Sequence, residues 1–152
     1  MSIKCLIAVF IMITTISCEE SAKSPEGLIK MYVKDVTTKS LSREYFEKYT
    51  TGKLLDSINS LSNDEFKKFV DLKKIKNAYA DISTKNCSES KCTITYVVKY
   101  DVVKDEEKEF SSEVKKIASL IKYEEIWKIE EVSNVKTYIE AKKPIDAMSE
   151  NN

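Results

Sequence analysis

The sequence contains no histidine, and its 152 residues include only two glycines, two prolines and one tryptophan. The lack of histidine removes the side chain that most often acts as a general base and the commonest metal ligand. The serine-hydrolase patterns Ser-x-x-Lys and Gly-x-Ser-x-Gly are also missing. We therefore expect no catalytic residues, no metal and no cofactor, and an enzyme is the least favoured functional class.

The formal net charge is zero, and no internal repeat is present. A near-neutral chain has no general electrostatic attraction to nucleic acid, so we expect no such partner. Charged residues make up 33% of the chain. Together with the scarcity of glycine and proline, this composition indicates a folded domain rich in helices and strands rather than a low-complexity chain.

No apolar run reaches the roughly 20 residues that a membrane-spanning helix needs. The longest begins near the N-terminus, where Lys4 is followed by the uncharged residues 6–13 and then by the small residues that precede Cys18. A charged start, a short apolar middle and small residues before a cleavage site are typical of a secretory signal peptide. We predict that residues 1–17 form this peptide, which leaves the length of one domain after cleavage.

The stretch Thr15-Ile16-Ser17-Cys18 resembles the lipobox of bacterial lipoproteins, although the family prefers leucine where Thr15 stands. The resemblance implies a lipidated Cys18 that anchors the protein to membrane lipid in the cell envelope. Glu19 after the cysteine favours the outer membrane if the host has two membranes. The alternative is an ordinary signal peptide with Cys18 as a chance thiol.

Two cysteines remain once Cys5 leaves with the signal peptide and Cys18 is lipidated. Cys87 and Cys92 flank four polar residues between two predicted strands, where directly opposite side chains lie about 4.5–5.5 Å apart at Cβ. This spacing and an oxidising compartment favour a disulfide over two free thiols.

The first half of the domain is predicted to be helical and the second half to be strands. Ser24-Pro25-Glu26 begins a helix that runs to about residue 37, and Ser62 to Glu65 form a capping box. Further helices are expected after Ser42 and over residues 54–61, and strands over residues 75–85, 94–102, 114–123 and 127–139. Helices followed by consecutive strands predict an α+β fold with a four-stranded antiparallel sheet.

This order, with Ser24-Pro25-Glu26 at its start and Trp127-Lys128-Ile129 in its last strand, resembles the nuclear-transport-factor-2-like superfamily, and within it small lumazine-binding-like lipoproteins. The similarity covers residues 24–140. It implies N-terminal helices packed on a curved sheet, a cone-shaped α+β roll that often encloses a pocket. Residues 18–23 are then a tether, and residues 141–152 a frayed tail.

A pocket inside such a cone would be lined by aromatic side chains, of which Tyr96, Tyr100 and Trp127 are the best candidates. The alternative is that these side chains fill the core between helix and sheet. Asp81 and Asp101 lie on predicted strands but opposite the apolar face, which disfavours them as catalytic carboxylates.

The leading hypothesis is a membrane-anchored, non-enzymatic binding module for an unknown protein of the envelope. The second is a carrier or sensor of a small apolar ligand inside the cone.

Overall fold

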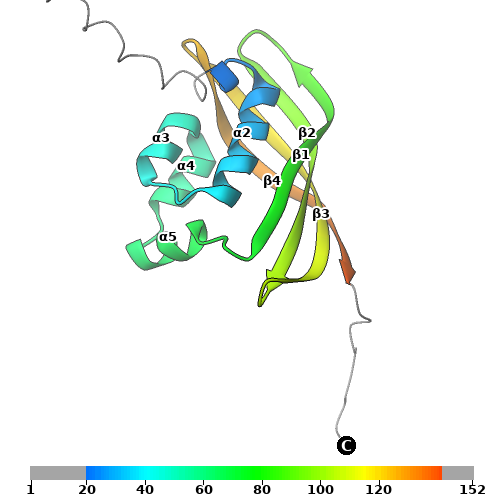
Figure 1. Cartoon of the computed structure of the whole chain (residues 1–152). Coiled ribbons are helices and arrows are strands. Elements are labelled where there is room, and N and C mark those ends of the chain that lie inside the picture. Colours follow the sequence, from blue (N-terminus) through cyan, green and yellow to red (C-terminus); the bar gives the residue numbers. More distant parts are fainter. Residues whose placement is uncertain (1–19, 142–152) are drawn as a thin grey trace, which may run out of the picture.

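The computed structural model describes residues 20–141; the predicted signal peptide, Cys18 and residues 142–152 lie outside this range. Four helices precede four strands (Figure 1), which confirms the predicted α+β fold. The helices are α2 (Pro25–Thr38), α3 (Arg43–Tyr49), α4 (Gly52–Asn59) and α5 (Asn63–Val70). The strands are β1 (Ile75–Cys87), β2 (Lys91–Lys104), β3 (Glu107–Tyr123) and β4 (Ile126–Ala141).

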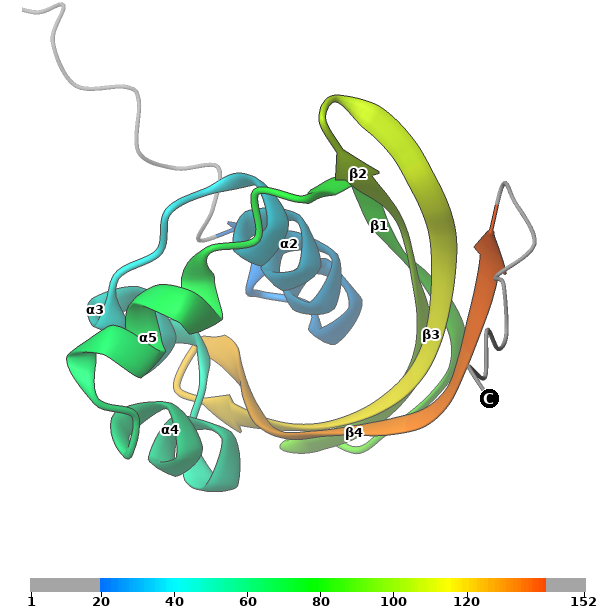
Figure 2. The same ribbon diagram turned by 90° about the horizontal axis from the view of Figure 1, so that it is seen from below.

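The strands form one antiparallel sheet in the order β1-β2-β3-β4. The sheet curves around α2, while α3, α4 and α5 lie where the curve is open (Figure 2). Register shifts interrupt all three strand pairs, for example between Lys115 and Lys116 and between Ser119 and Leu120. Such irregularities increase local twist and bend a strand, which accounts for the curvature.

Local capping signals set two of the helix starts as predicted. The Ser24 hydroxyl accepts a hydrogen bond from the Gly27 N–H at 3.1 Å, with Pro25 at the first helical position. The Ser62 capping box is complete, since Ser62 and Glu65 each accept from the other's backbone N–H. At α3, Ser42 occupies the N-cap position but its side chain makes no capping bond.

Strand β3 begins seven residues earlier than the apolar alternation predicted, at Glu107 instead of Val114. Asp105 and Glu106 both have positive φ, 50° and 66°. A two-residue turn of this kind continues the ladder directly from one strand to the next, and Lys104 therefore pairs with Glu107. The turn geometry, rather than buried apolar side chains, starts this strand.

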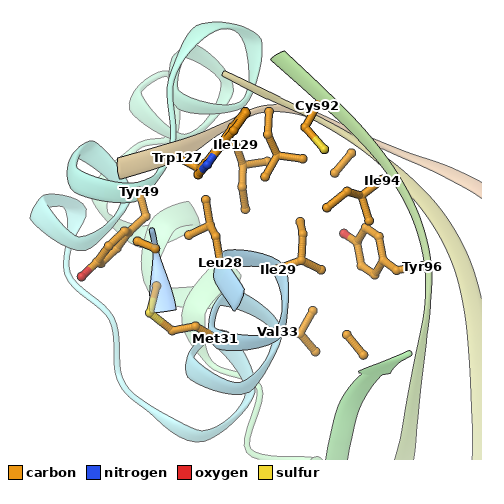
Figure 3. Close-up of a cluster of buried hydrophobic side chains, with 14 of the residues drawn as sticks. Leu28, Ile29, Met31, Val33, Tyr49, Cys92, Ile94, Tyr96, Trp127 and Ile129 are labelled. Carbon is orange, nitrogen blue, oxygen red and sulfur yellow. The ribbon is translucent and has the colours of Figure 1, made fainter. Parts of the chain in front are cut away.

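The main core lies between α2 and the concave face of the sheet (Figure 3). Helix α2 contributes Leu28, Ile29, Met31 and Val33. A smaller cluster of Leu41, Phe46 and Ile58 lies among the other helices. Within residues 20–141, no helix is long and apolar enough to cross a membrane.

The segment before α2 differs from the expected tether of residues 18–23. Ala22 is fully buried in the main core, and its carbonyl oxygen accepts a hydrogen bond from the Trp127 N–H at 2.8 Å. The Lys23 N–H donates to the Glu20 carbonyl oxygen at 3.2 Å, which closes a turn. Residues 20–23 are therefore part of the domain, because burial of Ala22 and the bond to β4 fix them there.

Candidate functional site

The predicted pocket residues lie on the inner face of the sheet, but α2 covers them. Tyr96 is 1% exposed and Trp127 6% exposed, and both belong to the main core, where Figure 3 shows them around Leu28 and Ile29. Tyr100 is partly buried and packs against the same cluster. Burial raises the pKa of the Tyr96 phenol. None of the three residues lines either of the two hollows described next.

A hollow of about 540 Å³ opens elsewhere, between residues 36–40 and the later stretch of chain from Lys67 to Ala78. One wall is the C-terminal end of α2 with residues 39–40, and another is the end of α5 with residues 71–73. The third is the start of β1, from Ile75 to Ala78. Its volume lies within the range of roughly 300–1,000 Å³ that is typical of small-molecule sites.

The hollow carries an excess of positive charge. Its lining includes four lysines, Lys39, Lys67, Lys73 and Lys76, but a single carboxylate, Asp71. The chain as a whole has no net charge. Lysines are thus concentrated here relative to the rest of the molecule, and the hollow favours a negatively charged group.

Three of these lysines are not held by strong ion pairs. Lys67 lies 4.0 Å from Asp64, and Lys73 lies 3.7 Å from Asp71, with both lysine side chains largely exposed. Lys76 takes part in none of the ion pairs found within residues 20–141. Exposed pairs of this kind contribute only about 0–1 kcal/mol, so these ammonium groups can turn towards a bound anion at little cost.

A second, smaller pocket of about 150 Å³ adjoins the hollow and is almost entirely apolar. Val36, Val70 and Leu72 line both spaces. The smaller pocket is completed by Tyr32, Leu41, Phe46 and Phe69. Phe69 is 41% exposed although its ring contacts that of Phe46, with 5.7 Å between ring centroids. The two spaces share three lining residues, so a basic surface and an apolar one lie side by side.

Asp35 is a buried carboxylate that sequence reasoning missed. It is 3% exposed, and its Oδ1 lies 2.7 Å from the Nζ of Lys39. Within residues 20–141, its Oδ2 and the nearby Tyr45 hydroxyl have no hydrogen-bond partner. Burial and then the Asp35 charge raise the pKa of the Tyr45 phenol above its usual range. The position of Asp35 in the helix could have revealed its burial, because Asp35 lies seven residues after Leu28 and four after Met31, on the same buried helix face.

The two strand carboxylates considered for catalysis are bound in polar contacts away from the buried face. Asp81 lies 3.6 Å from the Nζ of Lys99. Asp101 accepts hydrogen bonds from the side chains of Asn77 at 2.9 Å and Ser111 at 2.8 Å, and it pairs with Lys108 at 2.7 Å. These contacts, of which Lys108 is the strongest, hold the pKa of Asp101 well below its usual range.

The cysteine pair lies where the ladder of β1 and β2 ends. Cys87 and Cys92 are register partners with Cα atoms 4.0 Å apart, and their sulfur atoms are at disulfide distance, 1.96 Å. Cys92 is buried in the main core. Within residues 20–141, no three cysteine, aspartate or glutamate side chains are grouped as a metal site.

Comparison with known proteins bears on the fold alone. No family model and no curated protein matches the chain. The fold is similar to the solution structure of a SEC-C motif containing protein from Rhodopseudomonas palustris, with a TM-score of 0.56 and 14% sequence identity. The similarity covers 76% of this chain and 81% of that chain. This similarity shows that the two chains share an α+β fold.

Proposed function

We propose that this protein is a bacterial lipoprotein with a nuclear-transport-factor-2-like domain that acts as a non-enzymatic binding module in the cell envelope. The lipobox-like stretch that ends at Cys18 supports the anchor. The order of helices and strands supports the domain assignment. The missing histidine, and the occupation of Asp81 and Asp101 by ion pairs, support binding over catalysis.

One observation carries this proposal: the N-terminal segment and the basic hollow lie at opposite ends of α2. The bond from Trp127 to Ala22 holds the segment at the end where α2 begins, beside the turn between β3 and β4 (Figure 1). The hollow is lined by the other end of α2. A helix of 14 residues is about 21 Å long, so this length separates the two features.

A lipid on Cys18 would therefore anchor the domain by the end remote from the hollow. The chain from Cys18 to the fixed Ala22 spans about 14 Å at most. An anchor this short keeps the start of α2 near the membrane surface and turns the hollow towards the aqueous phase. A partner in that phase can then reach the hollow without competing with the bilayer.

The test combines a mass measurement with lysine footprinting. Mature protein isolated from its host should carry the added mass of acyl chains on Cys18. Reconstituted in vesicles and treated with an amine-acetylating reagent, it should be protected at Lys23, Lys91 and Lys122, which the strand register and backbone hydrogen bonds put near Ala22 and the anchored end. Lys67 and Lys73, at the hollow, should react as in the Cys18→Ser variant.

Two results would contradict the proposal. A bare Cys18 thiol would remove the anchor. Protection of Lys67 and Lys73 in the acylated protein would contradict the proposed orientation. The hollow would then face the membrane and would not be open to a partner in the aqueous phase.

The smaller pocket favours a second candidate function, a carrier or sensor of a small apolar ligand. Its lining of Leu41, Phe46, Phe69 and Val70 suits an uncharged guest, and its volume of about 150 Å³ limits that guest to a small molecule or part of one. Native mass spectrometry of protein purified from its own host distinguishes the two. A retained small molecule favours the carrier, whereas a bare mass and a crosslinked protein partner favour the binding module.

A further inference from the structure

The hollow suits a negatively charged group, and the smaller pocket beside it suits an apolar group. In the hollow, Lys67, Lys73 and Lys76 are available to a negative group. Asp71 is the only carboxylate among the lining residues, and Asp64, outside the lining, lies 4.0 Å from Lys67. Val70 and Leu72 line both the hollow and the smaller pocket. A purely polar anion would leave the apolar pocket without a partner, and a neutral apolar molecule would leave the lysines without one.

A ligand that uses both spaces therefore needs an acidic group and an apolar part. Lysine ammonium groups attract carboxylate, phosphate and sulfonate alike, because each is a compact charge with several acceptor oxygens. The smaller pocket offers aliphatic and aromatic contacts but no charged side chain. Burying apolar surface there stabilises a complex in proportion to the area removed from water.

From this arrangement we infer that the space between α2, α5 and the start of β1 is a binding site for an amphipathic anion. The apolar part of the ligand enters the pocket beneath Val36, Val70 and Leu72, and its acidic group lies among Lys67, Lys73 and Lys76. The inference rests on the second proposed function, the carrier or sensor of a small ligand, and adds the site and an acidic group on the ligand. Two sources share this chemistry, an acyl chain released from lipid and a soluble aromatic acid.

The test is calorimetric titration of the mature chain from residue 18, with Cys18→Ser so that no detergent is needed. The probes are decanoate, its neutral analogue decan-1-ol, acetate, and the cation decyltrimethylammonium. Decanoate should bind at least tenfold more tightly than decan-1-ol, and acetate and the cation should not bind measurably. Equal affinity for decanoate and decan-1-ol would overturn the inference, as would no binding by either.

Variants then locate the site. Lys67→Gln, Lys73→Gln and Lys76→Gln together should weaken decanoate binding at least tenfold and leave decan-1-ol binding unchanged. The matched control replaces three exposed lysines outside the hollow, Lys91, Lys115 and Lys122, by glutamine. Equal weakening in this control would mean that only overall charge matters, which would overturn the site.

Two further measurements complete the test. Leu72→Asn should weaken both decanoate and decan-1-ol, since Leu72 lines both spaces, and urea unfolding should establish that the variant is folded. Naphthalene-2-carboxylate separates the sources: tighter binding than decanoate assigns a compact aromatic acid, and weaker binding an acyl chain. Because the titrated chain carries no lipid, failure here leaves the anchored module standing, and a bare Cys18 in the host protein leaves this site standing.

Discussion

The backbone N–H of Trp127 donates to the carbonyl oxygen of Ala22, with 2.8 Å between nitrogen and oxygen. Two positions further along, the Ile129 carbonyl oxygen accepts from the Thr51 N–H at 2.9 Å. Strand β4 is an edge strand, and edge groups without partners invite pairing with other chains. The segment before α2 and the start of α4 thus cover the edge of β4 at its N-terminal end.

Replacing Ala22 should test whether this contact stabilises the domain. Ala22→Asp places a carboxylate in the core, where even an unpaired neutral polar group costs about 1–3 kcal/mol. We expect the free energy of unfolding to fall by about 3 kcal/mol or more. Urea unfolding followed by the fluorescence of Trp127, the single tryptophan, measures it. The neighbouring control Lys23→Asp, at an exposed position, should change stability by less than about 0.5 kcal/mol.

Gly27→Ala should destabilise the protein although alanine is the better helix former. Helix propensity alone favours alanine by about 1 kcal/mol. A Cβ at position 27, however, would lie 2.4 Å from the Ser21 carbonyl oxygen and 2.6 Å from the Ser24 hydroxyl. The first is a backbone atom that cannot move without disturbing residues 20–23. We expect a net loss of about 1–3 kcal/mol in urea unfolding. Lys34→Ala, on the exposed surface of α2, is the control. A gain in stability for Gly27→Ala would show that residues 20–23 can move to make room for the added methyl group.

The sequence predicted those parts of the fold that depend on local signals. The start of α2 follows from Ser24 and Pro25, and that of α5 from the Ser62 capping box. Strict alternation around Ile94 and Tyr96 correctly indicated which side chains face inward. Such signals act within a few residues, so one sequence is enough to read them.

The remaining features depend on contacts between distant segments. The alternation marks Tyr96 and Trp127 as inward-facing, but only the packing of α2 decides whether space remains beside them. The pairing of Ala22 with Trp127 has no local pattern that would reveal it. The hollow likewise arises where the ends of α2 and α5 meet β1, and its lysines are spread over residues 39–76. In the sequence, these lysines look like ordinary solvated surface.

Mature protein should contain a disulfide between Cys87 and Cys92. Mass analysis without reductant should give a value two hydrogens below that of the reduced chain. The loop between the two cysteines is short, with a sequence separation of 5, so the bond should contribute only about 2 kcal/mol. Replacing both residues by alanine should lower stability by at least that amount, because Cys92 is also buried in the main core, and should keep the fold. Two thiols that react in the native protein would contradict the prediction.

Asp101 should make the stability fall in acid. Hydrogen bonds from Lys108, Asn77 and Ser111 hold its pKa in the folded protein below the ordinary 3.8. The unfolded chain therefore takes up the proton first as the pH falls, and the stabilisation present above pH 3.8 is lost as the pH drops through the folded-state pKa.

The Asp101→Asn variant provides the measurement. The difference in free energy of unfolding between the two proteins should be constant near neutral pH and shrink below pH 3.8. Lys108→Gln should reduce the pH effect more than Asn77→Ala or Ser111→Ala does, because Lys108 is the largest cause of the lowered pKa. If the difference in free energy of unfolding stays constant well below pH 3.8, the effect of Asp101→Asn comes from altered hydrogen-bond geometry and not from the lost charge.

Tyr45→Phe should stabilise the protein, against the usual result of trimming a side chain in a packed region. The Tyr45 hydroxyl is buried and has no partner with full hydrogen-bond geometry within residues 20–141, although it lies close enough to the Asp35 carboxylate for that group to raise its pKa. Leaving such a group unpaired costs about 1–3 kcal/mol, and phenylalanine keeps the ring contacts to Phe46 and Tyr49. We expect a gain of about 1 kcal/mol in urea unfolding. Tyr79→Phe, at an exposed ring, should change little. A loss of stability for Tyr45→Phe would mean that the hydroxyl donates to Asp35 in solution, and Asp35→Asn should then weaken the same contact.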